Sequence, residues 1–196
     1  MLLIISLALA ADREIGFGVT TLPNTDGLGS ALGFGPQNGM VELSGGLPVH
    51  PNFAVTAAVM HGSTSQSIGS SADTFSSDIQ TRTWNTGVKL GVKASLDVAP
   101  WFAPYVSVQG VGLHGYLRLD DDPGVDDNLT QVDANGFSGG VTGAFGSTFR
   151  IKLTSATQLG LSGDIGYMWL APESLGEVAI VKVDGVTGRL AASLIF

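Results

Sequence analysis

The stretch TRTWNTGVKLGVKASLDV, residues 81–98, alternates between apolar and polar side chains over most of its length. Lysine, asparagine, serine, aspartate and glycine residues occupy odd-numbered positions, that is, one parity of the strand. The other parity holds Trp84, Val88, Leu90, Val92, Ala94, Leu96 and Val98. Successive side chains of a β-strand point to opposite faces, so a period of two indicates a strand. The stretch therefore predicts one strand with an apolar and a polar face, much longer than the usual length of about 5–6 residues.

The same alternation recurs along the chain, whereas helical spacing is nearly absent. Clusters of Gly, Pro, Asn and Asp separate the alternating segments. The fifth segment alternates least cleanly, and we expect a β-bulge near Gly110–Gly112 to reverse its parity. The eight predicted strands cover about 13–22, 39–47, 53–62, 81–98, 104–119, 136–153, 158–170 and 184–196.

The connections between these strands are alternately long and short. The long ones are 23–38, 63–80, 120–135 and 171–183, and the short ones are 48–52, 99–103 and 154–157. An even number of strands with short periplasmic turns and longer external loops is typical of bacterial outer-membrane barrels. Lipid tolerates no open sheet edge, so such a sheet must close. The sequence therefore predicts an all-β, closed, eight-stranded antiparallel up-and-down transmembrane barrel with both termini in the periplasm.

The first residues, MLLIISLALAAD, have the character of an export signal. Residues 2–11 are apolar except for Ser6, and Ala8-Leu9-Ala10 resembles a signal-peptidase cleavage site. The basic segment that normally precedes the apolar run is incomplete. We expect residues 1–11 to be a signal peptide and residues 12–196 to form a single barrel domain.

The overall composition excludes several classes of function. The net charge is −8 and no run of Lys or Arg occurs, so a nucleic-acid partner is not expected. The chain contains no cysteine, which excludes disulfides and thiolate metal sites. Charged residues make up only 13% of the chain, against about 25% in average soluble proteins. We expect no cofactor and no metal.

In the predicted topology the aromatic residues gather near the two ends of the strands. Two such girdles are typical of membrane barrels, because aromatic side chains favour the membrane interface. The external girdle is predicted to contain Trp84, Tyr116, Phe137, Tyr167 and Trp169. The periplasmic girdle is predicted to contain Phe53, Trp101, Phe102, Tyr105 and Phe196.

If the apolar parity faces lipid, most charged residues within strands face the barrel interior. The interior of an eight-stranded barrel is just wide enough for side chains, and unpaired buried charge is costly. We therefore expect a paired network that plugs the barrel, with strand-end solvent exposure as the alternative for Glu14 and Arg150. The predicted lumen network consists of Glu14, Glu42, Lys89, Lys93, Arg150, Asp164 and Arg189.

These features together resemble the small OmpA/OmpX-type outer-membrane β-barrels. In that family the last strand ends in an aromatic residue preceded by apolar residues at alternate positions, as in Leu190, Ala192, Leu194 and Phe196 here. The resemblance implies that the barrel-assembly machinery recognises this strand as an assembly signal. It also implies a monomer in contact with outer-membrane lipid and lipopolysaccharide.

Three motifs raise the possibility of chemistry. His61 and Ser63 share one face, as in barrels that deacylate lipid A, but the sequence assigns no acid to orient the imidazole. GFSGG, residues 136–140, matches a nucleophile-elbow pattern around Ser138, yet it opens a strand rather than a strand-turn-helix. The segment DDDPGVDDN, residues 120–128, is either a solvated acidic loop or a weak divalent-cation site.

The main functional prediction is a non-enzymatic outer-membrane barrel that serves envelope integrity or surface interaction through its external loops. The alternatives are a lipid-modifying enzyme that uses His61 and Ser63, a small channel, and a soluble secreted barrel of lipocalin type. A lipocalin-type barrel would turn its apolar parity inward and expose Lys89 and Lys93 to water.

Overall fold

The computed structural model describes residues 13–23, 39–68, 79–120, 132–171, 173–175, 179–181 and 183–196. The predicted signal peptide and most of the acidic loop lie outside these ranges. Within them, no helix has the length and apolar character that crossing a membrane would require.

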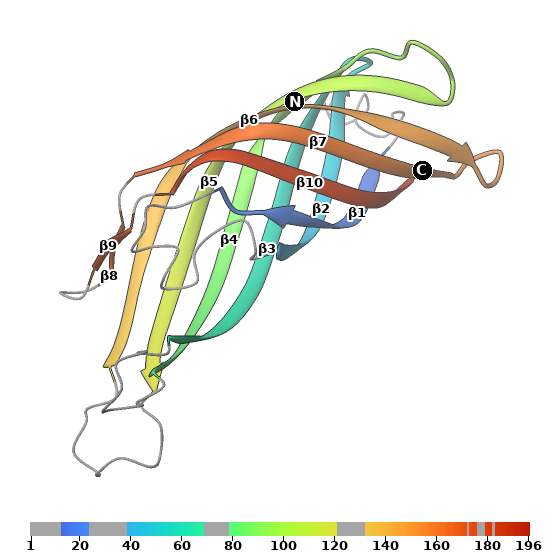
Figure 1. The fold of residues 1–196 in the computed structure, drawn as a ribbon. Helices are drawn as coiled ribbons and strands as arrows, with labels where there is room; N and C mark the ends of the chain where they lie inside the picture. Colours follow the sequence, from blue (N-terminus) through green and yellow to red (C-terminus); the bar gives the residue numbers. More distant parts are fainter. Residues whose placement is uncertain are drawn as a thin grey trace, which may run out of the picture.

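Eight long antiparallel strands close into a barrel in the order β1-β10-β7-β6-β5-β4-β3-β2 (Figure 1). Each strand pairs with its neighbours in the chain, and β1 pairs with β10 to close the sheet. The predicted closed antiparallel barrel is confirmed. Its strands are β1 (Glu14–Thr21), β2 (Gly39–His50), β3 (Phe53–Ile68), β4 (Ile79–Ser95), β5 (Phe102–Asp120), β6 (Val132–Lys152), β7 (Gln158–Leu170) and β10 (Asp184–Ile195).

The two ends of the barrel differ. The short-turn end carries the connections β2–β3, β4–β5 and β6–β7, together with the backbone hydrogen bonds between Arg13 and Phe196. The long-loop end carries the other connections. The last of these contains a small hairpin, β8 (Glu173–Leu175) and β9 (Ala179–Val181), where the sequence predicts only a loop. Strand β8 also contacts β6 (Figure 1).

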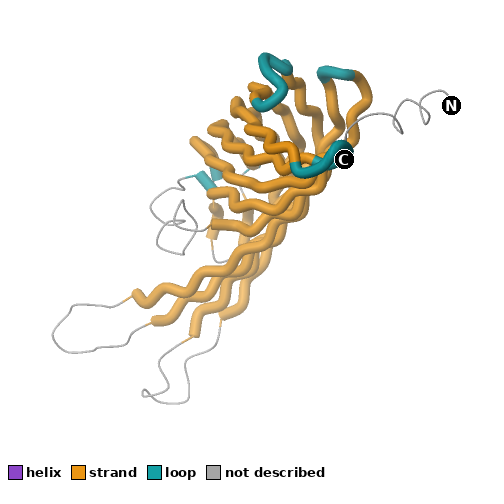
Figure 2. Tube along the Cα trace, turned by 90° about the vertical axis from the view of Figure 1, so that its right-hand side faces the viewer, coloured by secondary structure: helices purple, strands orange, loops and turns teal. Residues whose placement is uncertain are grey.

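Strands β3 to β6 reach far beyond the other four at the long-loop end, as two long hairpins (Figure 2). Their pairing continues to Ile68–Ile79 and to Leu119–Val132. The predicted boundaries at residues 62, 81 and 136 are therefore wrong. The segment added to β3, residues 63–68, is rich in Ser, Thr and Gln, so it carries no apolar alternation by which the sequence could mark it as strand; those added to β4 and β6, residues 79–80 and 132–135, are short.

The predicted bulge near Gly110–Gly112 is also wrong. The register of β5 runs without a shift from Gln80–Asp120 to Ser95–Tyr105 on one side, and is equally continuous against β6. The alternation of β5 is blurred for a different reason: its inward side chains are apolar in the half nearer the long-loop end. These are Val111, Leu113 and Leu117, and all three are buried.

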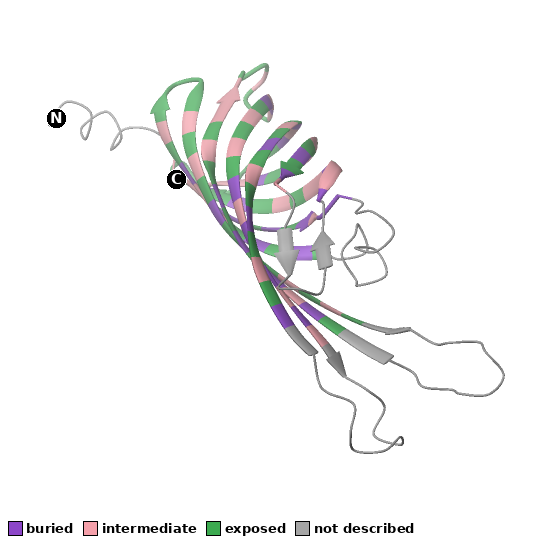
Figure 3. Cartoon of the chain, turned by 90° about the vertical axis from the view of Figure 1, so that its left-hand side faces the viewer, coloured by how far each residue is buried: buried purple, intermediate pink, exposed green. Residues whose placement is uncertain are grey.

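Exposure alternates along every long strand (Figure 3). The outward side chains form an apolar belt, which is the reverse of a water-soluble surface, where charged groups point outward. The inward side chains are buried or half-buried, and Lys89 and Glu42 are among the buried ones, contrary to a lipocalin-type arrangement. The apolar belt includes Phe17, Val19, Leu43, Val59, Val88, Leu90, Val92, Val108, Val141, Phe145, Ile165, Leu190 and Leu194.

Candidate functional site

The centre of the barrel holds Glu42 of β2 between two cations from other strands. Lys89 Nζ of β4 lies 3.0 Å from Glu42 Oε2, and Arg189 Nε of β10 lies 2.5 Å from Oε1. Glu42 is 2% exposed and Lys89 is 5% exposed. Each oxygen of the carboxylate therefore has a charged donor, which is what a carboxylate taken out of water requires.

Asp164 of β7 continues this network on the far side of Arg189. Arg189 Nη1 lies 3.6 Å from Asp164 Oδ2, and the hydroxyl of Tyr105 donates to the same oxygen at 2.6 Å. The remaining guanidinium donor Nη2 reaches Ser44 Oγ at 3.0 Å. Through the N–H donors of its guanidinium, Arg189 thus links β10 to β2 on one side and to β7 on the other.

Nearer the short-turn end, Lys93 of β4 pairs with Glu14 of β1. The distance between Lys93 Nζ and Glu14 Oε2 is 2.5 Å, and the ammonium also lies 5.4 Å from the centre of the Tyr105 ring. Both side chains are largely buried. This second pair spans the lumen nearer the short-turn end than the first pair does, so charged pairs occupy two successive levels of the interior.

Six of the seven residues of the predicted lumen network lie in this interior, and Arg150 does not join them. Arg150 faces inward at the mouth of the short-turn end, where its Nη1 lies 2.9 Å from Asp97 Oδ1. Asp97 is 58% exposed. Asp97 lies on the polar parity of residues 81–98 but beyond Ser95, the last residue of β4, and it is absent from the predicted lumen network.

Acids and bases balance in the described interior, where Glu14, Glu42 and Asp164 face Lys89, Lys93 and Arg189. The free volume enclosed among these side chains is about 50 Å³, which is room for a few water molecules. The geometry therefore holds these charges in fixed pairs.

The interior toward the long-loop end is mainly apolar, although Thr83, Asn85 and Ser138 are also buried there, and the sequence did not predict this apolar cluster. Three methionines and several aliphatic side chains fill it, and none is more than 5% exposed. The available signal was the run of inward apolar residues on β5 that blurred its alternation. The cluster consists of Leu22, Met40, Met60, Val111, Leu113, Leu117, Ala134, Met168, Leu170 and Val183.

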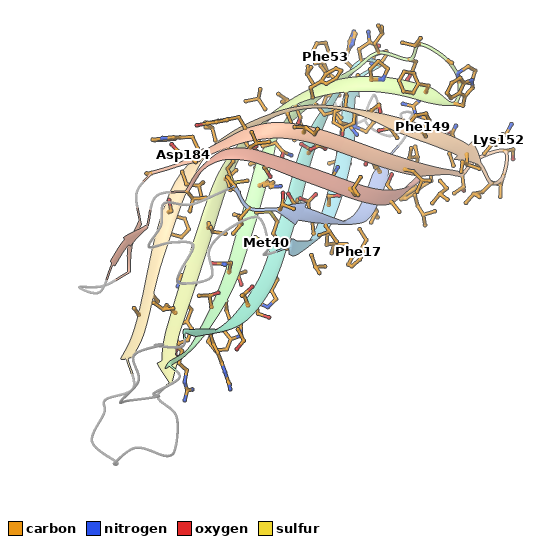
Figure 4. The ribbon with its side chains drawn as sticks, in the orientation of Figure 1. Phe17, Met40, Phe53, Phe149, Lys152 and Asp184 are labelled. Atoms are coloured by element: carbon orange, nitrogen blue, oxygen red, sulfur yellow. The ribbon has the colours of Figure 1, made fainter. Side chains whose placement is uncertain are left out.

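Most residues of the predicted girdles point outward. Phe53, Phe149 and Lys152 lie toward the short-turn end, and Asp184 lies toward the other (Figure 4). Exposed aromatic residues near the strand ends are Phe53, Trp101, Phe137, Tyr167, Trp169 and Phe196, while Trp84, Phe102 and Tyr116 are half-buried.

Tyr105 is the exception, since it faces inward and is only 5% exposed. Its assignment to the periplasmic girdle was wrong. Its parity places it in the lumen, where its hydroxyl has a carboxylate to bind.

The motifs considered for catalysis have other partners. His61 and Ser63 are exposed on the outward face, and His61 Nδ1 lies 2.9 Å from Thr86 Oγ1. No carboxylate of the described residues forms a hydrogen bond or ion pair with His61. Ser138 is buried, and its hydroxyl donates to the carbonyl of Ala171 at 2.5 Å. The described residues contain no group of three possible metal ligands of the His, Cys, Asp or Glu type.

Comparison with solved structures identifies the architecture. OprG, an outer-membrane protein of Pseudomonas aeruginosa, aligns over 95% of this chain and 96% of its own with a TM-score of 0.51 and 12% identity. A major outer-membrane protein of Thermus thermophilus aligns over 95% and 100% at 17% identity and a TM-score of 0.49. No family model and no curated protein sequence matches the chain. The likeness shows the fold, which is that of the small eight-stranded outer-membrane β-barrels.

Proposed function

We propose that this chain is a non-enzymatic barrel of the bacterial outer membrane. The observation that carries the proposal is the inverted distribution of polarity: the apolar belt surrounds the barrel, and the charged pairs lie within it. Lipid is the solvent that favours this arrangement, because exposure of the apolar belt to water is unfavourable. The short-turn end, with Arg13 and Phe196, then faces the periplasm, and the long loops face outward.

The interior supports a structural role rather than a passage. Charged pairs occupy the lumen at two levels, and the apolar cluster around Met40, Met60 and Met168 fills the part nearer the long-loop end. A water-filled channel needs a continuous polar path, and an apolar obstruction dewets it. We therefore propose that the barrel is plugged and that its function lies on its outer surface and loops.

The long-loop end supports a role in surface interaction. Beyond the pair Val41–His61, β3 continues to Ile68, and β4 is its only neighbour among the described strands. An edge of this kind presents backbone donors and acceptors to a partner. The polar hairpins formed by β3 to β6 would stand above the membrane and offer this surface to other molecules.

The last strand supports assembly by the barrel-assembly machinery. Leu190, Ala192, Leu194 and Phe196 all point outward and are exposed, in the alternation that the resemblance associates with this signal. We propose that the folded chain is a monomer whose partners are the surrounding lipid and lipopolysaccharide.

Heat modifiability tests the proposal. Outer-membrane fractions are run on a denaturing gel with and without boiling, because a closed barrel stays compact in detergent until it is heated. We expect the protein in the outer-membrane fraction and a shift in its mobility on boiling. Full recovery in the soluble periplasmic fraction would refute the proposed location.

A further inference from the structure

A hollow of about 740 Å³ lies in the outer face of the barrel wall, where it crosses β1, β10, β7, β6 and β5. Its floor consists of outward residues with short side chains, one from each of four neighbouring strands. Register places Gly163, Ser147 and Pro104 in a single row across the sheet. Gly188 continues the floor on β10, two residues from Leu190, which is the partner of Gly163.

Large apolar side chains of the belt flank this floor. Ile165 and Phe145 are paired on one side of it, and Leu190 and Phe102 lie on the other side. Leu190 is 73% exposed, Ile165 is 70% exposed and Phe145 is 67% exposed, so all three project away from the wall. The depth of the hollow comes from this contrast between projecting side chains and a floor that carries almost none.

Packing of the wall does not require glycine at the floor of the hollow. A Cβ at Gly188 would find its nearest neighbour at 3.7 Å, and a Cβ at Gly163 would meet the flexible Leu190 side chain at 3.2 Å. Neither glycine has a positive φ. The inward Gly146 and Gly166 differ, because a Cβ at either would overlap backbone atoms of the next strand. The space above Gly163 and Gly188 is therefore free for an external group.

The hollow runs obliquely across the height of the belt. On β1 and β10 it reaches Thr21 and Gly188, which lie toward the long-loop ends of these strands, and on β5 it reaches Phe102 at the short-turn end. Such a course is expected of a row across the strands, because the strands of a barrel are tilted against its axis. Ser147 and Pro104 lie in the halves of β6 and β5 nearer the short turns. In the proposed orientation this part of the hollow faces the periplasmic leaflet.

Two outward residues of the hollow carry hydroxyl groups, and only one of these groups has a partner in the wall. The Thr21 hydroxyl accepts a hydrogen bond from the backbone N–H of Gly188 at 2.9 Å. The Ser147 hydroxyl forms no hydrogen bond within the part of the chain that the structure describes. A hydroxyl among hydrocarbon is unfavourable unless it meets a polar group. Apolar walls with one available polar group are typical of a ligand site, and the volume lies in the usual range of about 300–1,000 Å³.

We propose that this hollow binds one fatty acyl chain of a phospholipid from the periplasmic leaflet, with the ester carbonyl of the chain accepting a hydrogen bond from Ser147. The hollow is continuous with the apolar belt, so its occupant must be as apolar as the belt's surroundings. The inference rests on the proposed membrane location and adds a lipid class and a binding site to it.

The width of the hollow favours a single chain over a protein. The rows of Phe145 and Phe149 are roughly 13 Å apart along β6, and their own side chains narrow the gap between them. An α-helix with its side chains is about 10–12 Å across, and the wall of a second barrel is broader still. A hydrocarbon chain is the component of a bilayer that is narrow enough to enter.

Native mass spectrometry of the folded barrel, stripped of lipid in detergent and titrated with phosphatidylethanolamine, tests the site. The variant Gly163→Leu/Gly188→Leu fills the hollow. The control Gly110→Leu/Gly139→Leu adds the same side chains at exposed outward positions elsewhere, where a Cβ would have its nearest neighbours at 3.7 Å and 4.0 Å. We expect one tightly bound lipid in the wild type, at least about tenfold weaker binding by the filled variant, and binding within about twofold of the wild type by the control. Equal binding by the two variants would overturn the site.

The role of Ser147 is tested with an ether-linked phosphatidylethanolamine, which lacks the acyl carbonyl. The wild type should bind it about fivefold more weakly than the ester lipid, as for loss of one hydrogen bond. Ser147→Ala should bind both lipids equally. A preference for the ester lipid that persists in Ser147→Ala would overturn the proposed hydrogen bond.

A further arm uses the wild type alone and depends on no variant. The barrel is placed in vesicles that contain phosphatidylethanolamine with a photoreactive acyl chain, and labelled residues are mapped by mass spectrometry. Labels should concentrate on Phe145, Ile165 and Leu190 rather than on Leu90, which is exposed on β4 away from the hollow. Even labelling around the belt would show ordinary lipid contact and refute a specific site. Displacement of the bound phospholipid by an equal concentration of lipid A would overturn the choice of lipid. The heat-modifiability gel reports the membrane barrel independently, so the two proposals can fail separately.

Discussion

Arg189 and Glu42 are 147 positions apart in the chain, and yet Arg189 Nε lies 2.5 Å from Glu42 Oε1. Closure of the barrel brings them together, because β1 lies between β2 and β10 in the sheet. The pair therefore spans the seam at which the first and last strands meet, and its strength bears on the stability of the closed state.

Replacement of Glu42 by alanine should destabilise the barrel severely. The change leaves Lys89 without its carboxylate and Arg189 with a single acid partner, and breaking a buried pair costs about 3–5 kcal/mol. Urea unfolding in detergent, followed by tryptophan fluorescence, gives the free energy of unfolding. The control Asp97→Ala removes an exposed partner of Arg150 and should cost no more than about 1 kcal/mol. Equal losses for the two variants would contradict a buried, coupled network.

Replacement of Leu190 by arginine should reveal whether the apolar belt faces lipid. Leu190 is 73% exposed in the middle of β10. A cation at the middle of a bilayer costs a barrel about 2–4 kcal/mol, whereas a water-facing surface would accept it. Unfolding in lipid vesicles measures the difference. The control Ser155→Arg lies in the exposed β6–β7 turn, beyond the belt, and should be neutral; a neutral Leu190→Arg would contradict a lipid-facing belt.

Replacement of Gly91 by alanine should strain the wall between β4 and β5. A Cβ at this position would overlap the carbonyl oxygen of Val108 and lie within 2.5 Å of Gln109 Cα, both parts of the backbone. Overpacking of this kind costs about 1–3 kcal/mol. Gly139 is the matched control, since its nearest neighbour would be 4.0 Å away. Comparison of the urea midpoints of the two variants checks the prediction, and equal midpoints would refute it.

Replacement of His61 or Ser63 by alanine should leave the acyl chains of lipid A unchanged. His61 forms a hydrogen bond with the hydroxyl of Thr86. A neutral hydroxyl stabilises a protonated imidazole far less well than a carboxylate does. Mass spectrometry of lipid A from cells that express each variant or the wild type provides the measurement. A missing acyl chain that returns with either variant would establish the enzymatic alternative.

The purified barrel should produce no discrete conductance steps in planar bilayers. The apolar cluster lies in series with the charged pairs, so a hydrated ion would have to cross a region lined mainly by apolar side chains. The variant Met60→Ala/Met168→Ala, which thins this cluster, is the informative comparison. Regular steps from the wild type would contradict the plugged interior and favour a small channel.

Local patterns determined much of the architecture in advance. Alternation in residues 81–98 and its repetition elsewhere predicted eight strands, and the rhythm of connections predicted their antiparallel order and closure. These features depend only on side-chain period and chain connectivity, and the structure confirms the barrel. Parity also placed Lys89 and Glu42 on the same face of their strands. The outer end of β3 could not be found in this way, because polar residues occupy both faces of residues 63–67.

The sequence by itself therefore determined the strand pattern and its period, which follow from neighbours in the chain, and it predicted closure because lipid tolerates no open sheet edge. Only the tertiary structure decided which charges meet: Glu42 with both Lys89 and Arg189, Tyr105 with Asp164, and Arg150 with Asp97 instead of the central network. It also decided that Gly163, Ser147 and Pro104 lie side by side on the outer wall. The physical reason is register: parity gives the face of a strand, but the height at which residues from different strands meet depends on how the whole sheet pairs and closes.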